Sequence, residues 1–60
     1  MKKSMLVKSA KAVIESMSNP SSGIWCFWIK NDGTLHYEFQ CGSGYDFALK
    51  VQNNKITLVK

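Results

Sequence analysis

Three side chains in the middle of this 60-residue chain are of types that cooperate in nucleophilic catalysis. Cys26 supplies a thiol, His36 a base, and Glu38 an acid that can orient the base. Such catalysis also needs a pocket that stabilises an oxyanion and excludes water, and the open face of so small a sheet provides neither. We therefore expect no enzyme activity and interpret Cys26 as an ordinary strand residue.

The two cysteines raise the further possibilities of a metal site and of a disulfide. Cys26, His36 and Cys41 are three candidate ligands without the paired spacing of a zinc motif, so we expect no metal site. Offset positions on neighbouring strands would hold the Cα atoms of Cys26 and Cys41 more than about 7 Å apart, too far for a disulfide. Free thiols in turn favour a reducing, cytoplasmic location.

The composition is typical of a small folded domain with a basic surface. Apolar residues make up 45% of the chain and charged residues 20%, which favours a packed core over disorder. We expect one domain over residues 1–60, and the longest apolar run, 24–29, is too short to span a membrane. The net charge of +4 comes from lysine without arginine, so it is a weak nucleic-acid signal.

A helical pattern covers about residues 4–18. Its apolar residues recur at spacings of three and four, which places them on one stripe, and lysines take the opposite side. Ser4 can cap the helix, and Asn19 before Pro20 ends it, because a residue that precedes proline avoids the α region. The apolar stripe consists of Leu6, Ala10, Val13, Ile14 and Met17.

From Gly23 onward apolar and polar residues alternate, which predicts four half-buried strands at about 24–30, 34–41, 45–52 and 55–59. The short turn sequences 31–33, 42–44 and 53–54 separate them. The predicted fold class is therefore α+β, with one N-terminal helix packed on a four-stranded antiparallel β-meander. The predicted core consists of Leu6, Val13, Met17, Trp25, Phe27, Tyr37, Phe39, Phe47, Leu49 and Leu58.

The turns fix the register, because a slip of one residue moves every side chain to the other face of the sheet. The turn at 53–54 pairs Val51 with Ile56, and the turn at 42–44 pairs Phe39 with Phe47.

The turn at 31–33 has two interpretations. A type I turn with a bulge at Gly33 pairs Lys30 with Thr34, so that Trp25, Phe27 and Ile29 point inward. A two-residue Asp-Gly turn would send Cys26 and Trp28 inward instead. We favour the bulged turn, since it buries three large residues and leaves Lys30 outside.

The helix covers one face of this sheet and leaves the other open. One predicted row across the open face contains Trp28, His36, Lys50 and Thr57, and the next contains Cys26, Glu38, Ala48 and Val59. In a meander the first strand is an edge, and residues 24–29 contain no charge or proline that would discourage pairing. The alternative is a different strand order, with residues 24–29 inside the sheet.

These observations favour a small non-enzymatic protein-binding domain with a regulatory role, an inhibitor or adaptor; its size suggests a phage or mobile-element origin. We expect a homodimer or a protein partner at the first strand, and no cofactor, small-molecule substrate or membrane. The expected partner-binding residues are Ile24, Cys26, Trp28, Lys30, His36 and Lys50. The alternative is single-stranded nucleic-acid binding, with Trp28 stacking on a base and Lys30, Lys50 and Lys55 holding phosphates.

Overall fold

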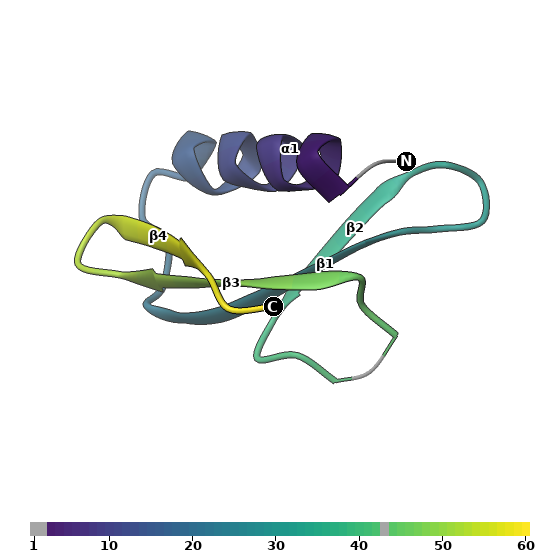
Figure 1. The fold of residues 1–60 in the computed structure, drawn as a ribbon. Helices are drawn as coiled ribbons and strands as arrows, with labels where there is room; N and C mark the ends of the chain where they lie inside the picture. Colours follow the sequence, from purple (N-terminus) through teal and green to yellow (C-terminus); the bar gives the residue numbers. More distant parts are fainter. Residues whose placement is uncertain (1–2, 43) are drawn as a thin grey trace.

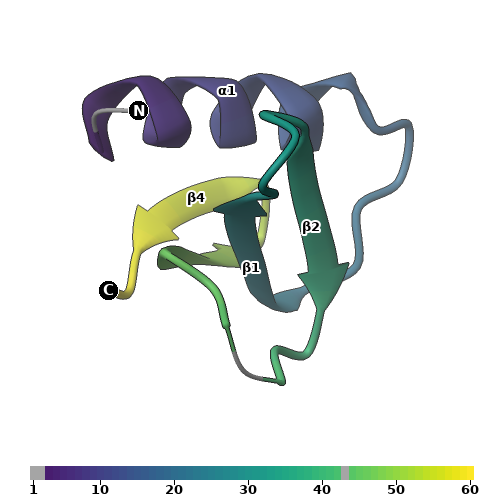
Figure 2. The ribbon, with the colours of Figure 1, turned by 90° about the vertical axis from the view of Figure 1, so that its right-hand side faces the viewer.

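One helix lies across a four-stranded antiparallel sheet in the computed structural model, which describes residues 3–42 and 44–60 (Figure 1). Helix α1 covers one face of the sheet, as two perpendicular views show (Figure 2). The elements in chain order are α1 (Lys3–Ser16), β1 (Gly23–Ile29), β2 (Leu35–Phe39), β3 (Phe47–Gln52) and β4 (Lys55–Leu58). The α+β class with an N-terminal helix is confirmed.

Helix α1 ends two residues earlier than the sequence pattern indicates. The hydroxyl of Ser16 donates to the carbonyl oxygen of Val13 at 2.7 Å, and the amide of Met17 donates to that of Ile14 at 3.1 Å. These bonds satisfy carbonyl groups of the last turn, so the chain leaves the helix before it reaches Asn19 and Pro20.

No helix in the described part of the chain is long and apolar enough to cross a membrane.

The strand order is β2-β1-β3-β4, so the predicted meander is wrong and β1 is a central strand. The alternative, in which residues 24–29 lie inside the sheet, is confirmed. Cys26 and Phe27 point to opposite faces and both are completely buried. The sequence of a strand that is buried on both faces is a continuous apolar run, because no residue of the strand faces water. The uncharged stretch that resembles an exposed edge is therefore the sequence of a central strand.

The first hairpin has the favoured register. Trp25 pairs with Phe39 and Phe27 with Tyr37. The amide of Lys30 donates to the carbonyl oxygen of Thr34 at 2.9 Å, and Gly33 has a φ of 88°, as the bulged turn requires.

Asp32 stabilises the same turn from its side chain. Its Oδ1 accepts a hydrogen bond from the amide of Thr34 at 2.9 Å. Hydrogen bonding by the side chain of Thr34, and then by its backbone, holds the pKa of Asp32 below its usual value. The carboxylate therefore stays charged and keeps its acceptor role to lower pH than a free aspartate would.

The last hairpin also has the predicted register, with Val51 opposite Ile56. Asn53 and Asn54 adopt φ angles of 50° and 64°, which gives the left-handed two-residue turn that matches the twist of the strands.

The predicted pairing of β2 with β3 is wrong. Phe47 pairs with Phe27, and Phe39 pairs with Trp25, because β1 lies between the two strands. Both β2 and β3 are antiparallel to β1, so residues 40–46 must pass over β1 to connect them. The described residues of this connection, 40–42 and 44–46, are here called the crossover and lie on the face opposite α1 (Figure 1). Residue 43 of the predicted turn lies outside the described residues.

The core lies between α1 and the two central strands. Phe27 and Phe47 stack there with ring centroids 5.6 Å apart. The buried cluster consists of Leu6, Ala10, Ile14, Phe27, Phe47, Leu49 and Val51, with Val13, Met17 and Trp25 half-buried against it. Three predicted core residues are exposed instead, because they lie on the edge strands that a single helix does not cover: Tyr37, Phe39 and Leu58.

Gly23 provides a test of the packing at the start of β1. Its φ of 148° lies in a region that other residues rarely adopt, and a Cβ there would lie 2.5 Å from Cε1 of Phe39. We expect Gly23→Ala to lower the free energy of unfolding by about 2–3 kcal/mol, because it adds backbone strain and pushes the ring of Phe39 away from Trp25. Urea denaturation measures the loss.

Gly33→Ala is the matched control. Gly33 also has a positive φ, of 88°, but no atom lies within 4 Å of a Cβ built there. We expect it to cost only about 1 kcal/mol, the backbone part of the effect. Equal losses in the two variants would contradict the role given to the contact with Phe39.

Candidate functional site

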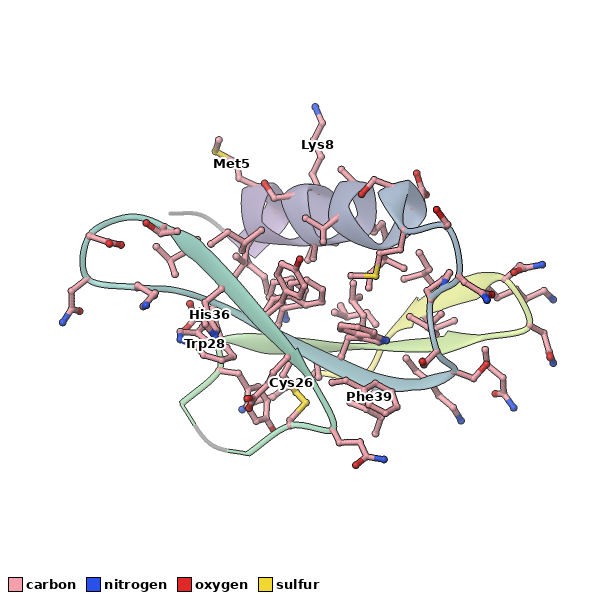
Figure 3. All side chains as sticks on the ribbon, turned by 180° about the vertical axis from the view of Figure 1, so that it is seen from behind. Met5, Lys8, Cys26, Trp28, His36 and Phe39 are labelled. Atoms are coloured by element: carbon pink, nitrogen blue, oxygen red, sulfur yellow. A yellow bond between two sulfur atoms is a disulfide. The ribbon has the colours of Figure 1, made fainter. Side chains whose placement is uncertain are left out.

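The face of the sheet opposite α1, here called the open face, carries the residues that the sequence singled out. A disulfide joins Cys26 of β1 to Cys41 of the crossover, with their Cα atoms 5.4 Å apart (Figure 3). The expectation of two free thiols is therefore wrong. The distance expected from the sequence assumed that Cys41 continues a strand, whereas the crossover folds back over β1 and brings Cys41 above Cys26.

The disulfide changes what Cys26 can do. Its side chain is completely buried beneath the crossover and its sulfur is bonded, so it is neither a nucleophile beside His36 nor a surface that touches a partner. The side chain of Cys26, a predicted partner-binding residue, is thus not exposed for direct contact with a partner. The disulfide also removes the free thiols on which the expected cytoplasmic location depended.

Further contacts hold the crossover on the sheet. The amide of Gly42 donates to Oε1 of Glu38 at 3.0 Å, and the amides of Gln40 and Asp46 donate to carbonyl oxygens of β1 at 2.8 and 3.0 Å. The Nζ atom of Lys60 lies 4.6 Å from the ring centroid of Tyr45, a cation–π contact. The crossover is thus bound at both ends and in the middle, and it divides the open face into two parts.

The first part contains Trp28 and His36. These residues are cross-strand partners, and their ring centroids lie 4.5 Å apart (Figure 3). Trp28 is half-buried, while His36 and Lys30 are exposed. This end of the open face therefore presents an aromatic pair near the first turn.

The second part contains Ile24 and Lys50, which pair with each other, and Thr57, which pairs with Lys50. The predicted row that joined Trp28 and His36 to Lys50 and Thr57 is therefore wrong. Trp28 lies four residues from Ile24 along β1, a distance of about 13 Å at the usual strand rise. The structure therefore separates the Trp28 ring from Lys50 of the nucleic-acid hypothesis, whereas Lys30 lies two residues from Trp28 at the first turn.

The other predicted row has the expected members. Cys26 pairs with Glu38 on one side and with Ala48 on the other, and the amide of Val59 donates to the carbonyl oxygen of Ala48 at 2.9 Å. The crossover and the end of β4 border a hollow above this row.

That hollow is an open groove of about 560 Å³. Ala48 is a small, buried residue in its lining, while Ile24 and Val59 remain 42% and 51% exposed beside it. The groove is lined by Ser22, Gly23, Ile24, Phe39, Gln40, Cys41, Tyr45, Ala48, Val59 and Lys60. Of the partner-binding residues expected from the sequence, only Ile24 lines it.

Sequence reasoning missed the groove residues of the crossover for a single reason. Tyr45 and Cys41 reach the open face through the crossover, and no pattern in the sequence shows that β2 and β3 are not neighbours. Ala48 and Val59 are the exceptions, because the alternation along their strands places both on this face.

The charges around the groove are mainly basic. Lys60 lines it, and exposed Lys50 lies next to Ile24 on the same face. Glu38 is half-buried and accepts the hydrogen bond from Gly42. The groove can therefore accept an apolar side chain with acidic neighbours.

Comparison with protein-family models, with curated proteins and with solved structures found no match for this chain.

The disulfide makes a prediction about stability. Cys26 and Cys41 are 15 residues apart, and closing a loop of this length contributes about 3 kcal/mol, mainly by restricting the unfolded chain. We expect dithiothreitol to lower the free energy of unfolding by about this amount in urea denaturation. The Cys41→Ala variant should show the same loss and no further response to dithiothreitol. Equal stability of the oxidised and reduced protein would contradict the role of the disulfide.

Proposed function

We propose that this chain is a non-enzymatic protein-binding domain, an inhibitor or adaptor, that takes an apolar side chain of a protein partner into the groove. The observation that carries the proposal is the exposure of Ile24 and Val59 beside a groove that contains buried Ala48. Apolar side chains that stay exposed around a concave surface are typical of sites for protein contacts.

The shape of the groove supports a protein partner. It is open to water along one side and is bordered by backbone and by flexible side chains such as Gln40 and Lys60. An anchor residue that projects from a partner can enter such a groove, while the rest of the partner covers it from solvent.

The basic charge supports an acidic partner. Lys60 lines the groove, and exposed Lys50 pairs with Ile24 on the same face, so both lysines place positive charge near it. Carboxylates next to the anchor would meet these lysines and raise the association rate more than the affinity. The apolar anchor then supplies most of the binding free energy.

The disulfide of Cys26 supports a non-enzymatic role and bears on the compartment in which the protein works. The bonded, buried sulfur of Cys26 leaves no thiol for catalysis, which favours binding over chemistry. The disulfide favours work in an oxidising compartment instead of the cytoplasm expected from the sequence.

Adjacent residues on β4 and just beyond it provide a matched test. Leu58 and Val59 are equally exposed, at 51%, but Val59 lines the groove whereas Leu58 pairs with Leu49 on the side of α1. Random peptides displayed on phage would be selected on the immobilised protein, and their Kd values measured by fluorescence anisotropy. We expect peptides with one large apolar residue flanked by acids. Val59→Glu should weaken their binding at least about ten-fold, or 1.4 kcal/mol, and Leu58→Glu should leave it unchanged.

Three outcomes would overturn the proposal. The first is a selection that yields no peptide, and the second is an equal loss of peptide binding in the two variants. The third is binding of labelled single-stranded DNA with a salt-dependent affinity that Val59→Glu does not change. The last result would support the nucleic-acid alternative in place of a protein partner.

A further inference from the structure

Strand β2 has unpaired backbone groups along its outer side. The amide of Lys30 donates to the carbonyl oxygen of Thr34, and that of Gln40 donates to Ile24, so the even-numbered residues of β2 bond to β1. The bonding direction alternates along an antiparallel strand. The N–H and C=O groups of odd-numbered residues therefore point away from the sheet, and within residues 3–42 and 44–60 no backbone hydrogen bond reaches them. These residues are Leu35, Tyr37 and Phe39.

Aromatic side chains lie beside these free groups. Tyr37 and Phe39 are 40% and 37% exposed, and their rings lie 6.2 and 5.3 Å from the ring of Trp25, measured between centroids. We call these three residues the aromatic shelf. Trp25 packs against the core, whereas Phe39 at the end of β2 also lines the groove on the open face.

The edge lacks two of the residue types that discourage pairing, lysine and proline. Its five residues, Leu35–Phe39, contain no lysine and no proline, whereas the other edge strand, β4, begins with Lys55. Natural proteins protect exposed edges with such residues. An edge without lysine or proline beside exposed aromatic rings is therefore suited to a partner strand.

We propose that β2 pairs antiparallel with β2 of a second copy of this chain, across a two-fold axis at Tyr37. In this register Tyr37 lies opposite the partner's Tyr37, and Leu35 lies opposite the partner's Phe39. All outward backbone groups of both strands are then paired, and the two aromatic shelves lie on the same face. The result is one continuous sheet across two copies.

The charged residues select this register. With the axis at Tyr37, His36 lies opposite the partner's Glu38, and the same contact occurs twice by symmetry. Moving the axis to His36 places two histidines opposite each other, and moving it to Glu38 places two carboxylates opposite each other. Both shifted registers keep the backbone pairing. The register centred on Glu38 places like charges opposite each other, which is destabilising, and the register centred on His36 lacks the hydrogen bond between a carboxylate and an imidazole. Only the Tyr37 register pairs a carboxylate with an imidazole.

Within one copy, both Glu38 and His36 remain available for the contact between His36 and the partner's Glu38. Glu38 uses Oε1 for the amide of Gly42, so Oε2 can accept a bond from the partner's His36. His36 is exposed and lies against Trp28 on the other side.

This interface goes beyond the proposed function, because it uses the outer edge of β2 instead of the groove. Phe39 borders both surfaces, but Tyr37 does not line the groove. Tyr37 therefore tests the interface without touching the groove.

Sedimentation velocity between about 10 μM and 1 mM, a range that covers weak dimers, measures self-association. We expect the wild-type protein to form a dimer, and Tyr37→Lys to raise its Kd at least ten-fold, because two lysines then meet at the axis. Leu58→Lys is the control on β4, the other edge strand. Leu58 is 51% exposed and lies on the side of α1, as Tyr37 does, so this variant should leave the dimer unchanged. A wild-type monomer at 1 mM, or equal effects of the two variants, would overturn the proposal.

A second experiment tests the register and does not depend on Tyr37. His36→Glu alone places two pairs of glutamates opposite each other, and Glu38→Lys alone places lysines opposite histidines. Each variant should self-associate at least about five-fold more weakly than wild type, while a mixture of the two should form a heterodimer with glutamate opposite lysine and glutamate opposite histidine. A mixture that associates no better than its separate components would overturn the Tyr37 register.

Discussion

The burial of β1 on both faces is the constraint on which the rest of this structure depends. Phe27 packs under α1, and Cys26 packs under the crossover, so neither cover can be removed without exposing the central strand. The helix covers its side with apolar side chains, whereas the crossover covers the other side with a covalent bond and a few polar contacts. On the face opposite α1, the crossover takes the place that a second helix would have over the central strand.

The different covers on the two faces of the sheet explain where the exposed apolar residues and the groove lie. One helix of 14 residues covers the central strands and leaves the edge strands partly bare, which exposes Tyr37 and Leu58. One narrow loop covers the middle of the other face and leaves a groove beside it, between Ile24 and Val59. Both candidate interaction surfaces are therefore consequences of incomplete covers over a small sheet.

The sequence predicts the local structure of this protein well and its long-range arrangement poorly. The helix, the four strands and the registers of both hairpins follow from periodicity and turn residues such as Gly33 and Asn53. The pairing of β1 with β3 cannot be predicted in the same way. It joins residues far apart in the chain, such as Trp25 and Leu49, and leaves no local signal. Every error at the candidate site, from the free thiols to the row containing Lys50, follows from that one missing contact.

The central position of β1 also has a consequence for the order in which the chain is made. Its partners β2 and β3 are both synthesised after it, and β3 is separated from it by the whole of β2 and the crossover. Until residues 47–52 leave the ribosome, the first hairpin presents an apolar, uncharged strand with one unpaired edge. The adhesive edge that the sequence suggests is absent from the finished fold but present in the nascent protein, where it exposes the chain to aggregation for as long as β3 is missing.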